Sequence, residues 1–487
     1  MARLETLHYG VRALRFGRRA EIATRKAIRG AGPCPQSAWT PVTPPAYPEG
    51  MQPTIRLNHN LLAVQGEHSV DVLVELAAPE APGDVTRPPL HLALVLDRSG
   101  SMAGAKLVTT KACASYLVRR LGPTDQLAVI AYDDQVDLVA PLSTDHGDAL
   151  LGAIDAIREG GSTNLSGGWL KGLEVLRGRR VEAGPDQAHG QDGSQSGPDA
   201  APPATRRVLL LTDGRANAGI TDPDALVRMA GAARAEGVST TTIGFGDDFA
   251  EAVLTGMGDA GGGNAHFVPT PDAAPAVFAQ EFDGLASVVA QNVSLEIRPG
   301  DDVVLVEVLN RYPATIVAGG VQLALGDAYG GERRAVVFSL NLPALADLGV
   351  AKVADVVLRY VSVDDQIAIH ELTLPVMVNV VTEAEAAQAD ADHTVIDEVL
   401  ILKTAQARDQ ARRLADAGDF EGGRSMLREC AIGLRSNAPM SSRADELLAE
   451  ADLLDELGTS LSPPLYDATT QKSLHYGSHE TRRRRGR

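Results

Sequence analysis

Two strand-like runs with a continuous apolar stretch constrain the fold of this chain most strongly. They are LHLALVL at 90–96 and RRVLLLT at 206–212. A strand without polar alternation belongs in the middle of a parallel sheet that helices cover on both sides. Helical patterns and further strands alternate around them: helices at 105–121, 146–157, 166–176, 222–237 and 274–290, and strands at 126–132, 238–246 and 265–268. Residues 90–290 are therefore predicted to form an α/β unit with a doubly wound, mostly parallel sheet.

The segments on either side of this unit have the residue patterns of β-strands, and a segment with helical patterns follows. Residues 51–80 and 291–380 carry short alternating or β-branched runs separated by turn residues, as the strands of an all-β sandwich do. Residues 383–457 are rich in Ala, Glu and Asp and are punctuated by Gly418 and Pro439, which predicts a helical bundle. The α/β unit is therefore expected to be inserted next to a β-sandwich, with a helical segment at the C-terminal side.

Three segments are predicted to lie outside these folded parts. Residues 1–50 are basic and are interpreted either as a disordered start or as sequence upstream of a true start at Met51. Residues 183–205 are rich in Gly, Pro, Gln and Asp, which is typical of a flexible surface loop. Residues 458–487 end in RRRRGR and are predicted to form a disordered basic tail.

Composition excludes several classes of protein. The net charge is −18; residues 1–50 carry +5 and residues 458–487 carry +4, so residues 51–457 carry −27. Such an acidic body argues against a nucleic-acid partner. No apolar run approaches the roughly 20 residues of a transmembrane helix, so no transmembrane segment is expected. The three cysteines lie far apart, which excludes a disulfide scaffold and favours a reduced, cytoplasmic protein.

Polar residues follow the predicted strands at one edge of the sheet. DRSGS at 97–101 and TDG at 212–214 each follow an apolar strand, and GGSTN at 160–164 precedes a helix. Ligands of such sheets bind outside the carboxyl ends of the strands. The candidate metal ligands are Asp97, Ser99, Ser101, Thr163 and Asp213. Hard oxygen donors without His or thiolate favour Mg²⁺ or Mn²⁺, and neutral hydroxyl ligands leave the ion electron-poor, so a carboxylate from another molecule is the expected further ligand.

These three segments resemble the metal-ion-dependent adhesion site of von Willebrand factor type A domains, and the resemblance covers about residues 90–290. It implies a Rossmann-like domain that binds Mg²⁺ or Mn²⁺ and, through the metal, an acidic residue of a protein partner. It also implies that Ser99, Ser101 and Thr163 contact the metal and that the two aspartates act largely through water. The flanking segments are similar to bacterial, cytosolic members of the family and to the layout of inter-α-trypsin inhibitor heavy chains. The resemblance thus implies a binding protein rather than an enzyme.

Two other functions stay open on the sequence. The family resemblance also allows an accessory subunit of a AAA+ ATPase complex of the MoxR or chelatase type. The chain has no P-loop, so the ATPase would be a separate chain. A Mg²⁺-dependent hydrolase is less favoured, because no general base or phosphate cradle is placed beside the candidate ligands.

Other residues near these motifs have simpler interpretations. The acidic pairs Asp133–Asp134 and Asp364–Asp365 follow strands and are interpreted as solvated turns. Trp169 begins the helix after the Thr163 loop and is expected to pack in the core. Arg98 is expected at a variable position where it could meet an anionic partner.

Overall fold

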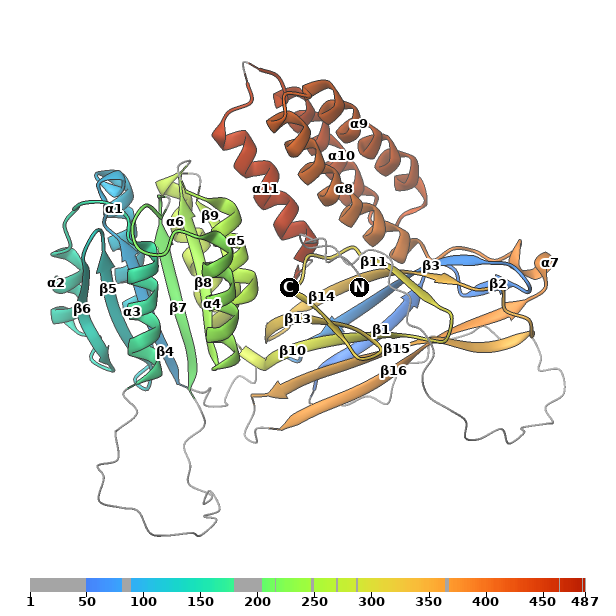
Figure 1. The fold of residues 1–487 in the computed structure, drawn as a ribbon, viewed down its shortest axis with the longest axis horizontal. Coiled ribbons are helices and arrows are strands. Elements are labelled where there is room, and N and C mark those ends of the chain that lie inside the picture. The colour runs from blue at the N-terminus through green and yellow to red at the C-terminus, as the bar shows by residue number, and fades with distance from the viewer. Residues whose placement is uncertain are drawn as a thin grey trace, which may run out of the picture.

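The computed structural model describes residues 50–80, 89–178 and 204–486, apart from residues 215, 247–248, 269, 286–287, 364–367, 464 and 484. They form an α/β domain, a β-sandwich and a helical bundle (Figure 1). The predicted fold class is confirmed: a doubly wound α/β domain lies next to an all-β sandwich, and a helical segment follows. The expectations for residues 1–49 and for 183–203 lie outside the described residues.

The α/β domain is built on a six-stranded sheet with the order β6-β5-β4-β7-β8-β9. Its strands are β4 (Leu90–Asp97), β5 (Gln126–Tyr132), β6 (Val136–Ser143), β7 (Thr205–Thr212), β8 (Val238–Phe245) and β9 (Gly262–Val268). All neighbours run parallel except β5 and β6. One face is covered by α1 (Ala105–Val118), α2 (Asp148–Asp155) and α6 (Ala274–Leu285), and the other by α3 (Leu165–Arg177), α4 (Pro223–Ala235) and α5 (Glu251–Ala260). The sequence patterns predict neither β6 nor α5.

The position of β4 between two cores explains why its sequence does not alternate between apolar and polar residues. Leu92, Leu94 and Leu96 enter the core under α1, α2 and α6. Ala93 and Val95 enter the core under α3, α4 and α5. Since successive side chains of a strand point to opposite faces, a strand between two cores must be apolar at every position.

The β-sandwich consists of two sheets. The five-stranded sheet has the order β1-β3-β14-β11, with β17 beside β14, and the six-stranded sheet has the order β12-β13-β10-β15-β16-β2. The strands are β1 (Gln52–Leu57), β2 (Leu61–Ala63), β3 (His68–Ala77), β10 (Val288–Pro299), β11 (Val304–Val308), β12 (Ala314–Val317), β13 (Gly320–Tyr329), β14 (Arg333–Leu342), β15 (Gly349–Ser362), β16 (Ile369–Val381) and β17 (Arg485–Gly486). β3 pairs with β14, and β2 pairs with β16. The α/β domain is therefore inserted between β3 and β10.

The helical part begins at the end of β16 and packs on the sandwich. Its helices are α7 (Glu383–Ala386), α8 (His393–Asp416), α9 (Phe420–Asn437), α10 (Ala444–Ser460) and α11 (Ala468–Arg483). Val395, Val399 and Leu402 of α8 pack against Leu73 of β3 and Val337 of β14. The outer face of the five-stranded sheet is thus covered by α8. None of the helices in the described part of the chain combines the length and the apolar character needed to cross a bilayer.

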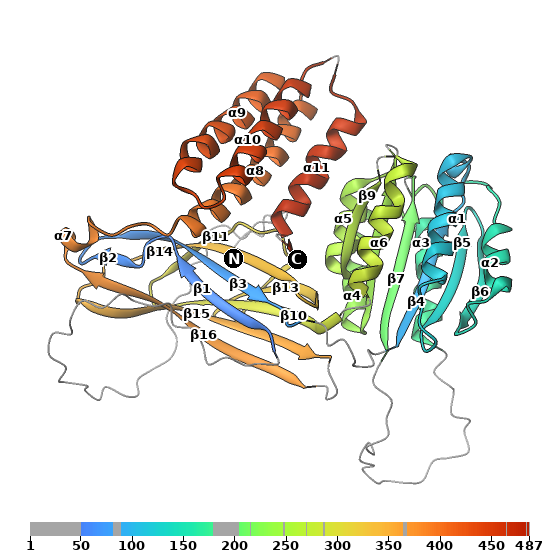
Figure 2. The same ribbon diagram turned by 180° about the vertical axis from the view of Figure 1, so that it is seen from behind.

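Helix α11 corrects the expectation of a disordered tail at 458–487. It lies between α8 and the α/β domain in both views of the molecule (Figures 1 and 2). Lys472 Nζ donates to the backbone carbonyl of Phe249 at 2.8 Å, and Ser478 Oγ donates to the carbonyl of Ala405 in α8 at 2.7 Å. The buried side of α11 is made largely of Lys, His, Ser and Tyr side chains, so a hydropathy pattern does not reveal it.

Candidate metal centre

The predicted metal ligands lie at the carboxyl edge of the α/β sheet, where two neighbouring strands end. Asp97 is the last residue of β4, and Asp213 directly follows β7. The two strands are adjacent and parallel, with Leu96 opposite Leu211, so both carboxylates leave the sheet side by side. Both side chains are fully buried. Two carboxylates in this position need positive charge or hydrogen bonds to compensate their burial.

Serine hydroxyls and Thr212 provide part of that compensation. Ser101 Oγ donates to Asp213 Oδ1 at 2.6 Å and lies 3.2 Å from Ser99 Oγ. Asp97 Oδ1 accepts the backbone N–H of Ser99 at 2.8 Å, and Asp97 Oδ2 accepts Thr212 Oγ1 at 2.6 Å. The DxSxS segment therefore wraps around the end of β4 and turns its oxygen atoms toward the end of β7.

Thr163 approaches the same oxygen atoms from the loop before α3. A Cβ atom built on Gly214 would lie 3.1 Å from Thr163 Oγ1 and 3.7 Å from Ser101 Oγ, which places both hydroxyls beside the turn after β7. The loop is held by Asn217 Oδ1, which accepts the Thr163 backbone N–H at 2.8 Å. Asn164 caps α3 by accepting the N–H of Gly167. The structure thus places all five predicted residues around one cluster of oxygens.

Asp133 holds the glycine loop in place, and its interpretation as a solvated turn is wrong. The residue is only 6% exposed. Asp133 Oδ2 accepts the N–H of Gly161 at 3.1 Å, and its backbone carbonyl accepts the N–H of Asn164 at 2.8 Å. A Cβ atom on Gly160 would lie 1.8 Å from Asp133 Oδ2, so a side chain there would displace the Asp133 carboxylate. The other acidic pair, Asp364–Asp365, lies outside the described residues.

Arg98 is occupied by acidic neighbours of its own chain. Its Nη2 lies 3.2 Å from Asp133 Oδ1 and 2.6 Å from Asp137 Oδ2. Burial alone would raise the pKa of Asp133, but hydrogen bonds from Gln135, Gly161 and Arg98 outweigh burial and lower it. An anionic partner at Arg98 would therefore compete with two internal carboxylates. Trp169, as expected, is fully buried in the core.

The two buried aspartates differ in their charge environment. Burial raises the pKa of Asp97, the hydrogen bonds from Ser99 and Thr212 oppose that rise, and the negative charge of Asp213 adds to it. Asp213 instead has a cation beside it, because Lys106 Nζ lies 2.5 Å from Asp213 Oδ2. Sequence reasoning missed Lys106, although its place in the first turn of the helix after DRSGS is the signal that could have found it.

The donor set fits a hard divalent cation. The cluster offers carboxylate and hydroxyl oxygens without imidazole or thiolate. Mg²⁺ and Mn²⁺ prefer such oxygen ligands, whereas zinc favours imidazole and thiolate. Within the described ranges, no group of three or more His, Cys, Asp or Glu side chains could hold a metal by itself. A metal at this edge would therefore be held by carboxylates and hydroxyls together, as the sequence predicts.

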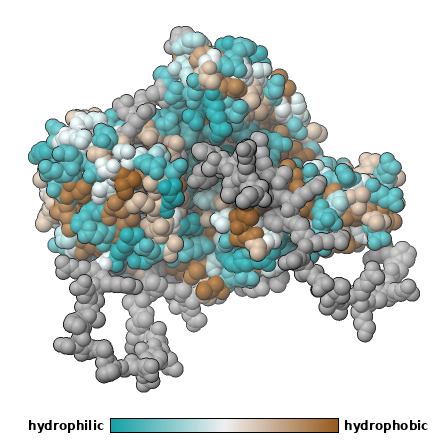
Figure 3. Space-filling view, in the orientation of Figure 1, coloured by the Kyte–Doolittle hydropathy of each residue, from teal (hydrophilic) through white to brown (hydrophobic). Residues whose placement is uncertain are grey.

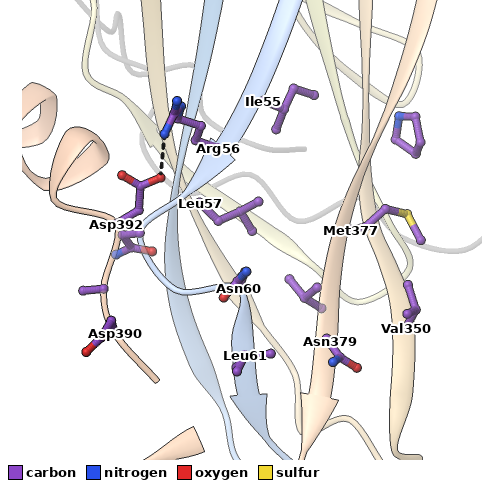
Figure 4. A pocket seen from close by; sticks show the side chains of 14 residues that line it. Ile55, Arg56, Leu57, Asn60, Leu61, Val350, Met377, Asn379, Asp390 and Asp392 are labelled. Carbon is purple, nitrogen blue, oxygen red and sulfur yellow. Dashed lines mark hydrogen bonds and ion pairs between the residues drawn. The ribbon is translucent and has the colours of Figure 1, made fainter. Parts of the chain in front are cut away.

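A separate cavity of about 380 Å³ opens at the edge of the sandwich (Figure 4). It lies between β1, with Ile55 and Leu57, and β16, with Met377 and Asn379. Arg56 Nη1 pairs with Asp392 Oδ2 at 3.2 Å along one side. None of the five cluster residues lines this cavity, so it is not part of the candidate metal centre.

Comparison with known proteins identifies the type of domain to which this sheet belongs. Residues 91–280 match the model of the von Willebrand factor type A domain. A protein of Synechocystis named only as uncharacterised is 28% identical over 359 residues, which is 71% of this chain and 78% of that protein. An uncharacterised protein of Escherichia coli is 29% identical over 213 residues, which is 43% of this chain but only 34% of that protein.

A solved structure shares the fold of nearly the whole chain. The von Willebrand factor type A protein from Catenulispora acidiphila superposes with a TM-score of 0.64 at 16% identity, over 90% of this chain and 98% of that chain. At this identity the likeness shows the fold alone. The α/β domain, the sandwich and the helical bundle are therefore an arrangement found elsewhere.

Proposed function

Residues 91–280 form a von Willebrand factor type A domain, and from that premise we propose that this chain binds a protein partner through a divalent cation. Such domains generally mediate metal-dependent protein–protein interaction. The residues proposed to hold the cation, Mg²⁺ or Mn²⁺, are Asp97, Ser99, Ser101, Thr163 and Asp213. A bound cation would supply an electrophilic centre for a carboxylate of the partner. No catalytic step is assigned to the chain.

One observation carries this proposal: three separate chain segments deliver oxygen donors to one point at the carboxyl edge of the sheet. Ser101 Oγ lies 2.6 Å from Asp213 Oδ1 although 112 positions separate the two residues. The glycine loop that presents Thr163 is fixed by the buried side chain of Asp133. A cluster whose supports are buried and hydrogen-bonded is preorganised, which favours metal binding over a chance gathering of polar residues.

The decisive experiment measures Mg²⁺ affinity by titration calorimetry for the wild type and for Thr163→Ala. Removal of the Thr163 hydroxyl is expected to weaken Mg²⁺ binding at least about tenfold, because a donor is lost from a fixed set. The variant is expected to stay folded, since Thr163 contributes its backbone, and not its hydroxyl, to the hydrogen bond that fixes its loop. Thr144→Ala, at an exposed threonine after β6, is the matched control and should bind as the wild type does.

Partner capture in Mg²⁺ and in EDTA extends this test to function. A protein retained by the wild type in Mg²⁺ should be lost in EDTA and lost with Thr163→Ala. Equal capture in all three conditions would contradict a cation-bridged interaction. Capture of a AAA+ ATPase would favour the accessory-subunit alternative, which stays a prediction from the family resemblance.

A further inference from the structure

The positive charge of Lys106 lies inside the proposed cation site. Its Nζ is 2.5 Å from Asp213 Oδ2, and the carboxylate of Asp213 is fully buried. Ser101 Oγ donates to the other oxygen of the same carboxylate. An ammonium in contact with a buried carboxylate neutralises it and offsets the cost of removing it from water.

The surrounding backbone is shaped to bring this lysine to the cluster. Lys106 is the second residue of α1, which follows Gly104 at a positive φ of 79°. Its stem runs past Gly246, where φ is 67° and an added Cβ would lie 3.3 Å from Lys106 Cε and 3.4 Å from Nζ. The lysine side chain is therefore confined between the turn after β4 and the turn after β8, and it points at Asp213.

In the described part of the chain, no lysine or arginine forms an ion pair with the second carboxylate of the cluster, that of Asp97. Asp97 accepts hydrogen bonds from the backbone of Ser99 and from the hydroxyls of Thr212 and Tyr132. A divalent cation held by the five oxygen donors would thus share Asp213 with the ammonium of Lys106. Two cations at one carboxylate repel each other, and the repulsion is stronger beside a buried carboxylate than in bulk water.

We propose that Lys106 is a built-in competitor for the divalent cation at Asp213 and so sets the cation concentration that the site requires. This inference rests on the proposed function. Without a bound cation, the lysine neutralises the buried carboxylate. A divalent cation binds Asp213 only by displacing the ammonium group. Lys106 is therefore an affinity-determining residue of the site and not one of the cation ligands.

Lys106→Met tests the proposal because it keeps most of the stem and removes the charge. We expect the dissociation constant for Mg²⁺, measured by calorimetry with Mg²⁺ alone, to fall at least about tenfold in the variant. Lys106→Arg keeps the charge and is expected to stay within about threefold of the wild type. Lys171→Met, at a half-buried lysine of α3 that pairs with Glu174, is the matched control and should leave the affinity unchanged.

Thermal unfolding distinguishes two roles of Lys106, that of a counter-ion and that of a packing residue. Lys106→Met should unfold at a lower temperature than the wild type in EDTA and recover most of the difference in saturating Mg²⁺, because the cation then replaces the lost charge. An equal loss of unfolding temperature in EDTA and in Mg²⁺ would assign Lys106 a packing role only and overturn the inference.

The calorimetric outcomes distinguish this inference from the proposed function. If the wild type binds Mg²⁺ and Lys106→Met binds it with the same affinity, Lys106 is not a competitor and the proposed function stands. If neither the wild type nor Lys106→Met binds Mg²⁺ or Mn²⁺, both proposals fail together. Binding by Lys106→Met at a concentration where the wild type shows none would be the clearest support for competition.

Discussion

Arg207 shows how much one side chain does in this molecule. It lies in β7 and is fully buried. Its guanidinium contacts Glu281 Oε1 of α6 at 3.2 Å, Asp327 Oδ2 of β13 at 3.1 Å and Tyr329 Oη of β13 at 3.1 Å. Burial alone would raise the pKa of Glu281, but His266 and Arg207 outweigh burial and hold it well below its usual range. Arg207 thus joins the α/β domain to the sandwich.

Replacing Arg207 by leucine is expected to lower the free energy of unfolding by about 3–5 kcal/mol, because the buried carboxylate of Glu281 and the partly buried one of Asp327 lose a cationic partner. The measurement is urea denaturation at pH 7. Arg206→Leu is the control, since Arg206 is only half-buried and donates to the backbone carbonyl of Glu236. A loss of less than about 1 kcal/mol for Arg207→Leu would show that the network contributes little to stability.

At the residue scale, the sequence predicted donors but not their supports. The five candidate ligands were found because strand ends and loop motifs are local patterns with known places in a parallel sheet. Lys106 and Asp213 are 107 positions apart, and no local pattern reports that their side chains meet. In the sequence, nothing distinguishes Asp133 from an exposed acidic residue of a turn. Its burial appears only once the glycine loop packs over it. Charge compensation within the site therefore had to come from the structure.

At the scale of elements, strands that are buried on both faces have a distinctive sequence, and this made most of the α/β domain predictable. β4 and β7 each contain a run that is apolar on both faces, so their sequences are distinctive. β6 is an edge strand with largely exposed or half-buried residues, and its mixed sequence carries no such signal. α11 is stabilised by polar contacts to two other parts of the chain, so its composition suggested a solvated tail. The pairing of β3 with β14 joins residues that lie on either side of the inserted domain, and local patterns predict only that such partners exist.

Docking of α11 is expected to weaken in acid because of His475. Burial and the positive charges of Arg311 and Arg412 lower its pKa to about 3 from 6.5, Asp409 opposes that shift, and His479 adds to it. The buried imidazole is therefore neutral, while an undocked or unfolded chain takes up a proton near its ordinary pKa. The contribution to stability is full above about pH 6.5 and falls as the pH drops from there toward 3.

The measurement is the urea midpoint at pH 8, 7, 6 and 5 for the wild type and for His475→Asn. The wild type should lose more stability than the variant between pH 7 and pH 5, because asparagine does not titrate. Parallel losses in the two proteins would mean that His475 does not govern docking. Limited proteolysis after Ser460 provides an independent readout of whether α11 has come away.

At the scale of the whole molecule, the three parts share buried contacts and are expected to unfold together. Arg207 ties the α/β domain to β13, and Lys472 of α11 pairs with Glu251 of α5 at 3.0 Å. On the face that Figure 3 shows, hydrophilic residues are common and apolar residues are scattered among them. These buried junctions are therefore expected to couple the unfolding of the three parts.

A cation bound at one end of such an assembly should stabilise all of it. Calorimetry of the wild type is expected to show one transition, raised by Mg²⁺ by the equivalent of about 2.7 kcal/mol at a cation concentration of 100 times the dissociation constant. Thr163→Ala should show the same transition with a rise that is smaller by at least about 1.3 kcal/mol, because its affinity for Mg²⁺ is expected to be at least about tenfold weaker. Two separate transitions, of which Mg²⁺ moves only one, would show that the junctions do not couple the parts.

The insertion of the α/β domain between β3 and β10 has a mechanical consequence. Each of these strands lies inside its sheet, β3 between β1 and β14, and β10 between β13 and β15. If a partner binds at the metal edge as proposed, a force on it would reach the sandwich through these two chain connections, one in each layer, and through the contacts of Arg207 and α11. An interior strand is released only by breaking hydrogen bonds with neighbours on both of its sides, whereas an edge strand can be peeled away from one. For a partner bound as proposed, the sandwich would therefore provide anchorage at two interior strands.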